Sequence, residues 1–206
     1  MLNYYLSFLP FISYWATCGI LELFYCKDDK TLESTKNTIT KKEVFYNTLS
    51  VTSSTVLINM LCVYFNIFDN ETLRYYYILL GIWMIDTIEY FFHITMHKVK
   101  FLYKHMHKHH HSLHIPYHFG ALYNSSCEST IESILIFSGI YLLGFSYKEF
   151  IIVTSLAHIA TVIDHTSLNY KKQFHYLHHT IYNNNNFQQP FFTYYDKLFG
   201  TYKIIE

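Results

Sequence analysis

Charged residues are scarce in this chain, while aromatic residues are abundant. Only 15% of the 206 residues are Asp, Glu, Lys or Arg, whereas 20% are Phe, Trp or Tyr. An ordinary soluble domain has about 25% charged residues, so the composition favours a membrane protein. The formal net charge of zero is uninformative, and we expect no nucleic-acid partner.

Several motifs of other redox and metal proteins are also missing. The four cysteines form no C-x-x-C pair, and we interpret them as packing thiols. The chain contains no G-x-G-x-x-G fingerprint of a dinucleotide-binding fold. It also lacks the Glu-x-x-His pairs that carboxylate-bridged di-iron bundles use. These absences leave histidine as the main candidate metal ligand.

Histidine is concentrated in one part of the chain. All fourteen histidines lie between His93 and His179, and eight form three boxes, namely His93-x-x-x-His97, His107-x-x-His110-His111 and His175-x-x-His178-His179. Such spacings place imidazoles about one helical turn apart. Because one zinc ion takes three or four protein ligands, eight candidate ligands predict two metals in one cage. The alternative is a basic, pH-responsive loop, which the three regular boxes disfavour.

Apolar runs predict an all-α integral membrane protein with about four to five transmembrane helices. The clearest spans are 2–25, where Glu22 is the one charged residue, and 49–68, which carries no charge. A third is 75–92, and 131–164 is long enough for two short passes or for a hairpin buried in protein. The first segment lacks a basic start and a small-residue cleavage site, so we expect a retained span.

Lysine positions predict the sidedness of this arrangement. Lysines follow the first span and again the third span: Lys27, Lys30, Lys36, Lys41, Lys42, and then Lys98, Lys100, Lys104 and Lys108. An excess of lysine marks cytosolic loops. We therefore divide the chain into membrane helices over 1–92 and a histidine-box region over 93–206, which includes a membrane hairpin at about 131–164. The helix ends and following loops are expected to form a cytosolic helical cap around both metals.

Two acids and a tyrosine precede the first box on what should be the same helical face. Asp86, Glu89 and Tyr90 lie at helical spacing from His93 and His97. They are candidates to support the metal ligands through hydrogen bonds. Equally, an acid near a helix end caps against a neighbouring segment or faces water, and both readings stay open.

Other histidines are weaker candidates. His105 and His109 alternate with members of the second box and are expected to point away from the metals. His158 lies seven residues before His165, and we favour a hydrogen-bonded core histidine over a deeper ligand.

The boxes, their order and their flanks resemble the fatty acid hydroxylase and sterol desaturase superfamily of membrane non-haem di-iron oxygenases. The run Y-K-H-M-H-K-H-H-H at 103–111 resembles the Y-K-x-x-H-K-x-H-H of C-4 methyl sterol oxidases and C-5 sterol desaturases. Asp86 and Tyr90 stand where the family has an acid and an aromatic residue. Glu128 matches the end of the family's H-P-x-E, and Asp164-His165 resembles the start of its D-H-S-G-Y. The run Y-D-K-L-F-G-T at 195–201 is similar to the closing W-D-R-L-F-G-T.

The chain departs from the family pattern at several places, among them one extra residue between His97 and Tyr103. Ile94 stands where an Arg usually follows the first histidine, and Ser125-Ser126 replaces the His-Pro of H-P-x-E. Residues 166–168 read T-S-L in place of S-G-Y. None of these changes removes a histidine box.

The resemblance implies two non-haem irons and names their ligands. These are His93, His97, His107, His110, His111, His175, His178 and His179, with His165 as the ninth. Glu128 joins Asp86, Glu89 and Tyr90 as a candidate supporting residue. The implied activity is an O2-dependent lipid hydroxylase or desaturase, with sterols slightly ahead of fatty acyl chains as substrates. Electrons would come from NAD(P)H through a separate reductase, often with a b-type cytochrome.

The resemblance also implies a place in the cell. We expect a multi-pass protein of the bilayer, in the endoplasmic reticulum if the host is eukaryotic, with a slot that admits the lipid from the membrane. Two other classes are possible. One is a membrane zinc enzyme or zinc transporter, although transport predicts ligands inside the spans rather than at their ends. The other is a non-catalytic relative that retains its metals as a structural staple.

Overall fold

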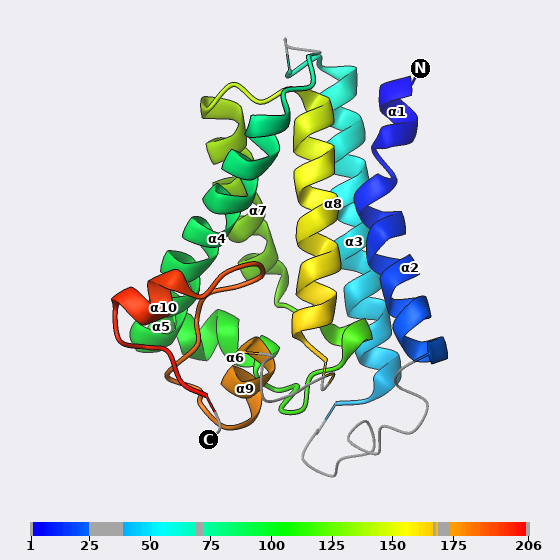
Figure 1. Cartoon of the computed structure of the whole chain (residues 1–206). Helices are drawn as coiled ribbons and strands as arrows, with labels where there is room; N and C mark the ends of the chain where they lie inside the picture. Colours follow the sequence, from blue (N-terminus) through cyan, green and yellow to red (C-terminus); the bar gives the residue numbers. More distant parts are fainter. Residues whose placement is uncertain (1, 25–38, 69–71, 167, 169–173, 205–206) are drawn as a thin grey trace.

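All the regular secondary structure in the described residues is helical. The computed structural model describes residues 2–24, 39–68, 72–166, 168 and 174–204 (Figure 1). Within these ranges the residues form helices, turns and loops, and none lies in a β-strand. The predicted all-α class is therefore confirmed. Ser167 and the lysines at 27, 30 and 36, on which part of the sequence analysis depends, lie outside the described residues.

Five long helices of the described chain form the body of the molecule. They are α2 (Leu9–Phe24), α3 (Lys41–Tyr64), α4 (Tyr75–Lys98), α7 (Ser126–Leu142) and α8 (Tyr147–Asp164), with the short α1 (Leu2–Leu6) before α2. In Figure 1, α2, α4 and α8 run downwards and α3 and α7 run upwards. As a result, the last turns of α4 and α8 and the first turn of α7 meet at one end of the bundle.

Short helices close this end of the bundle. After α4 come α5 (Lys100–Leu102), a π-helical turn (Tyr103–His107), α6 (Lys108–His110) and a 3-10 turn (His118–Gly120). Beyond α8 come α9 (Phe174–Thr180) and α10 (Tyr194–Leu198). All three histidine boxes therefore lie at the lower end of Figure 1.

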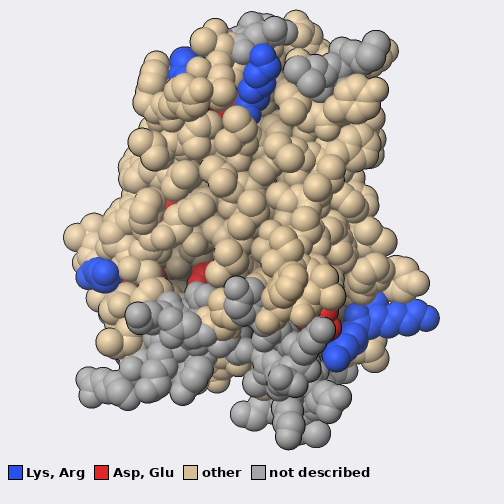
Figure 2. Space-filling model, turned by 45° about the vertical axis from the view of Figure 1, so that its right-hand side comes forward, with Lys and Arg blue, Asp and Glu red and all other residues tan. Residues whose placement is uncertain are grey.

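Two segments of the described chain are long and apolar enough to cross a bilayer. These are Asn3–Phe24 and Tyr75–Lys98, as judged by length and composition. Figure 2 shows a broad band without Lys or Arg across one face, with the basic side chains toward the ends. Helix α3 has 24 residues, α7 has 17 and α8 has 18, or about 36, 26 and 27 Å at 1.5 Å per residue. The expected four to five spans stay a prediction for these three helices.

Small residues let the helices that carry the site approach closely. A Cβ on Gly81 of α4 would lie 2.7 Å from a methyl group of Val153 on α8. A Cβ on Gly139 of α7 would lie 2.8 Å from the sulfur of Met84 on α4. Helix α4 is therefore packed tightly against both members of the α7–α8 hairpin, which fixes the direction in which its last turn projects the first box.

An ion pair secures the end of the bundle that is distant from the histidines. The Arg74 guanidinium donates to both carboxylate oxygens of Glu149, at 2.9 and 2.7 Å, and to the carbonyl of Gly144 at 2.7 Å. Ser146 and Glu149 form a capping box at the start of α8. Gly144, with φ of +69°, provides the left-handed residue that ends α7. Together these contacts join the start of α4 to the turn at 143–146 inside the predicted hairpin region.

Candidate metal centre

Three separate elements bring the histidine boxes together. His93 and His97 occupy the last two turns of α4, and the third box lies on α9. The second box begins in the π-helical turn and continues through α6. A π-helical turn inserts an extra residue into a helix and is frequent at functional sites. Here it contains His107 and leads directly into α6, which contains His110.

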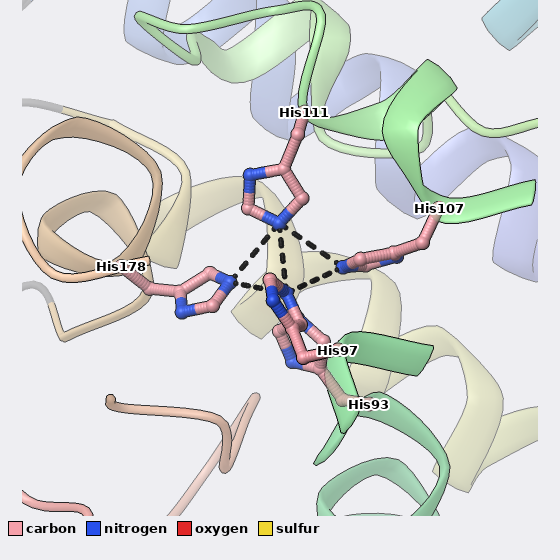
Figure 3. A group of neighbouring side chains, drawn as sticks. All are labelled: His93, His97, His107, His111 and His178. Carbon is pink, nitrogen blue, oxygen red and sulfur yellow. Dashed lines mark hydrogen bonds between the residues drawn. The ribbon is translucent and has the colours of Figure 1, made fainter. Parts of the chain in front are cut away.

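The first histidine group contains five rings, from all three boxes. The candidate ligand nitrogens of the five lie within 4.8 Å of one another, and the rings point toward a common centre in Figure 3: His93, His97, His107, His111 and His178. Five pairs of Nε2 atoms lie 2.8 to 3.1 Å apart, and they involve His97, His107, His111 and His178. The Nε2 of His93 is buried and has no hydrogen-bond partner.

The second group contains four buried rings. Their candidate ligand nitrogens also lie within 4.8 Å of one another: His110, His165, His175 and His179. The Nε2 of His179 is 2.8 Å from that of His110 and 3.2 Å from that of His175. The Nε2 of His165 is buried without a hydrogen-bond partner. The two groups together contain the nine predicted ligands, whose metal binding stays a prediction.

Adjacent histidines serve different groups. His110 and His111 are neighbours in sequence, yet the first belongs to the four-ring group and the second to the five-ring group. His178 and His179 divide in the same way. The ring planes within these pairs are 83° and 89° apart. Each His-His dipeptide therefore links the two groups.

Hydrogen bonds from Nδ1 direct the other ring nitrogen inward. The Nδ1 atoms of four rings donate to backbone carbonyls: His93 to Phe187 at 2.9 Å, His110 to Tyr123 at 3.0 Å, His165 to Thr161 at 2.8 Å and His178 to Asn185 at 2.7 Å. A carbonyl only accepts, so the proton is on Nδ1, and Nε2 of a neutral ring presents its lone pair.

Burial keeps these rings neutral. It is the largest cause that lowers the pKa of His110 to about 4 and that of His165 to about 3. Burial and the neighbouring rings also lower the pKa values of His175, His178 and His179 well below their usual range. Neutral imidazoles with converging lone pairs repel one another at about 3 Å unless a cation lies between them. The donor set therefore fits metal ions.

Glu128 supports one of the candidate ligands directly. Its Oε1 accepts a hydrogen bond from Nδ1 of His107 at 2.5 Å. Ser125 caps α7 by accepting from the backbone N–H of Glu128 at 3.3 Å. Ser125 is one of the positions at which the chain departs from the family pattern. The serine nevertheless caps α7 and so places Glu128 in the first turn of this helix.

Asp86 and Tyr90 contact the C-terminal segment. Asp86 accepts from the Gln188 side chain at 3.0 Å and from the backbone N–H groups of Phe191 and Phe192 at 3.0 and 2.8 Å. Tyr90 stacks on Tyr195 and Phe199, at centroid distances of 5.3 and 5.6 Å. For Asp86, the structure thus matches the alternative in which the acid binds a neighbouring segment.

The segment at 185–188 accepts hydrogen bonds from two candidate ligands. This role of the segment was not predicted from the sequence. Its carbonyls at Asn185 and Phe187 accept from His178 and His93. Asp196 in turn accepts from the backbone N–H groups of Phe187 and Gln188, at 2.9 and 2.8 Å. The run of four Asn residues at 183–186 overlaps this segment. The signal that could have found this role is the Y-D-K-L-F-G-T motif, which contains Asp196.

The five remaining histidines have other partners. His105 is exposed beside Phe101, and the ring of His109 stacks on Tyr123 with centroids 4.5 Å apart. His114 is exposed, while buried His118 pairs with Glu22 at 3.0 Å. His158 donates from Nδ1 to the carbonyl of Pro10 at 2.9 Å, as expected of a core histidine.

A hollow leads from the side of the bundle to the histidines. Its outer groove lies between α3 and α7 and shares Val51, Ile58 and Phe137 with a middle cavity between α3, α7 and α8. The middle cavity shares Glu89 and Glu132 with an inner cavity, which is bordered by His93, His107 and His110. We call the three spaces together the hollow. Glu89, the last of the candidate supporting residues, therefore borders the hollow.

A family comparison agrees with this geometry. The chain matches the fatty acid hydroxylase family over residues 78–201. It belongs to the fatty acid hydroxylase family. This confirms the membership that the histidine boxes predicted.

Four of the related proteins are named as sphinganine C4-monooxygenases or sphingolipid C4-hydroxylases. Sphinganine C4-monooxygenases 2 and 1 of Arabidopsis thaliana are 32% and 31% identical, over 95% and 94% of this chain and 86% and 85% of their own lengths. The sphingolipid C4-hydroxylase sur2 of Schizosaccharomyces pombe is 35% identical over 58% of this chain and 45% of its own. No solved structure matches the chain. The names of these relatives lend no support to the expected sterol substrate.

Proposed function

We propose that this protein is a membrane-bound, O2-dependent lipid hydroxylase that uses two non-haem metal ions. The observation that carries the proposal is the convergence of nine histidine side chains, eight of them buried, in two groups at the inner end of the hollow, which we therefore call the lipid hollow. The names of the most similar relatives favour hydroxylation over desaturation, and a sphingoid base over a sterol, as the substrate. We assign the reaction to C4 of that base.

The spacing of the nitrogens favours iron over tetrahedral zinc. With metal–nitrogen bonds of about 2.1 Å, ligands at right angles have nitrogens about 3.0 Å apart, whereas tetrahedral ligands have them about 3.4 Å apart. The Nε2 atoms of the first group are 2.8 to 3.1 Å apart. This spacing suits a metal of higher coordination number that keeps a position open for O2.

Each part of the chain then has a defined task. Two bound irons supply the oxidising power, derived from O2, that breaks an unactivated C–H bond. The nine imidazoles hold the metals through neutral nitrogen donors, and Glu128 fixes the orientation of His107. The carbonyls of Asn185 and Phe187 fix His178 and His93. Burial of the rings excludes bulk water from the site.

The membrane placement and the partners belong to the same proposal. Helices α2 and α4 cross the bilayer, and α3, α7 and α8 accompany them as further spans. The histidine end faces the cytosol, where a reductase fed by NAD(P)H, or a b-type cytochrome, docks from the water side. In a eukaryotic host the endoplasmic reticulum is the expected membrane. The lipid substrate enters sideways, through the groove between α3 and α7.

Metal analysis with turnover tests this function. Protein purified in detergent should contain about two irons per chain by elemental mass spectrometry. With a reductase it should consume O2 and convert sphinganine to its 4-hydroxylated product, and it should leave a sterol and a fatty acid unchanged. If the protein instead contains two zinc ions that iron cannot replace and takes up no O2, the hydroxylase proposal is wrong. The protein would then be a zinc enzyme or a non-catalytic relative.

A further inference from the structure

Two acidic side chains meet at the neck between the middle and inner cavities. Glu89 on α4 and Glu132 on α7 border both cavities and hydrogen-bond to each other. Carboxylates only accept hydrogen bonds, so such a pair holds at least one proton and carries at most one negative charge. Among the described residues that line the two cavities, none is Lys or Arg. The lining therefore offers this pair no lysine or arginine partner.

Two buried oxygens without partners also mark the lipid hollow. Glu128 is 3% exposed and borders the inner cavity, where Oε1 accepts from His107 and Oε2 has no hydrogen-bond partner. Asn59 is 1% exposed and borders the middle cavity, and its Oδ1 has no partner. Buried polar atoms are nearly always paired. These acceptors therefore point to a ligand that brings hydrogen-bond donors into the lipid hollow.

The chemistry of the proposed reaction locates such donors. In a sphingoid base the amine is on C2 and hydroxyl groups are on C1 and C3, so the amine nitrogen lies three bonds from C4. At about 1.5 Å per bond, the ammonium must enter the same cavity as the reacting carbon. The lining of the inner cavity contains both kinds of residue, histidines of the two groups and acidic side chains.

We propose that Glu89 and Glu132, with the free oxygen of Glu128, form a subsite that binds the ammonium and hydroxyl groups of a long-chain amino alcohol. The inference rests on the proposed function and specifies how that site selects its substrate. An ammonium ion neutralises the charge of the Glu89–Glu132 pair. A hydroxyl group donates to Glu128, whose other oxygen holds His107. The subsite thus places C4 next to the histidine groups.

The rest of the lipid hollow suits the hydrocarbon tail. The middle cavity is lined by apolar side chains that include Ile85, Ile136 and Phe150, and it continues into the groove between α3 and α7. Beside that groove, Leu57 and Ile134 are 59% and 57% exposed on the outer surface. An apolar rim of this kind lets the tail enter from the bilayer while the polar head moves inward.

The substitution Glu132→Gln tests the subsite, because it removes the charge but keeps the shape. Two substrates are compared, sphinganine and its N-acetyl derivative, which has the same C4 but no ammonium. The expected result is at least about a tenfold loss of kcat/KM for sphinganine, mainly through KM, and less than about a twofold change for the amide. Iron content should stay unchanged. Glu132→Asp, which retains the charge, should recover part of the loss.

Several outcomes would overturn the subsite. Equal losses on both substrates would give Glu132 a merely structural role, and so would no loss on either. A loss of iron would assign the acid to the metal centre. Equilibrium binding of both compounds to the purified protein separates the two proposals. If sphinganine binds in a way that depends on Glu132 but is not turned over, the subsite proposal stands and the hydroxylase proposal is wrong. If the protein binds sphinganine no more tightly than the amide, the subsite proposal is wrong even if hydroxylation occurs.

Discussion

The two ends of the helix bundle are stabilised in different ways. At the end near the start of α8, Arg74 and Glu149 satisfy each other, and Ser146 completes the helix cap. At the opposite end, buried nitrogens of His93 and His165 have no partner within the described chain. The first end is therefore complete as a polypeptide, whereas the second has buried nitrogens that the proposed metal ions would bind.

The largest expected effect comes from removing a ligand. His110→Ala or His178→Ala should abolish metal loading and turnover, because each deletes a nitrogen that faces its group. Membrane insertion should persist, since the distant end keeps its contacts. Elemental analysis and O2 uptake measure the effect. His105→Ala is the matched control, because that ring is exposed, and equal effects from all three variants would contradict the assignment.

Removing the metals should lower the local stability of the histidine end of the bundle and leave that of the opposite end unchanged. After chelation, hydrogen exchange should rise in 93–111 and 174–188, which hold the three boxes, and should stay unchanged around the turn at 143–146. Binding of a metal at a hundred times its dissociation constant stabilises a fold by about 2.7 kcal/mol. Reloading with iron should therefore also raise the melting temperature. Uniform exchange over the whole chain after chelation would show that the ends are not independent.

Glu128→Gln should weaken the site without emptying it. The amide cannot accept from Nδ1 of His107 with the strength of a carboxylate, so metal affinity or activity should fall about 10- to 100-fold. Metal titration of the apoprotein measures the change. Lys42→Gln, on the exposed start of α3, serves as the control variant. An unchanged affinity would remove Glu128 from the support of the ligand.

Arg74→Ala should destabilise only the end of the bundle that is distant from the histidines. It leaves the carboxylate of Glu149 buried without its cation, which should lower the free energy of unfolding by about 2 kcal/mol. Chemical unfolding in detergent measures the loss. Iron content per folded chain should match the parent protein, and a selective loss of iron instead would mean that the two ends are coupled.

The smallest expected effect is that of Ser125→Ala. Removing the cap of α7 should cost about 1 kcal/mol of stability. Because the cap also positions Glu128, metal affinity should fall slightly, by less than in Glu128→Gln. Ser125→Asp, which can replace the cap, should restore stability in the same unfolding assay.

Much of the fold was readable from local sequence patterns. The apolar runs over 2–25, 49–68 and 75–92 overlap α2, α3 and α4, since helix length and hydropathy are local properties. The region 131–164 contains parts of α7 and all of α8, separated at the turn around Gly144. The relation of Asp86 to the C-terminal segment was not readable, because its partners lie more than 100 residues away.

The sequence by itself determined which side chains form the candidate centre. Box spacing is local, so His93 and His97 face one side of a helix wherever that helix is placed. Only the tertiary structure decided how the nine histidines divide into two groups. Adjacent residues on a helix point about 100° apart, so His110 and His111 must face different directions, and the centre that each one faces depends on the packing of α4, α8 and α9. The same packing brings Glu89 and Glu132 together from two helices, where no local pattern could place them.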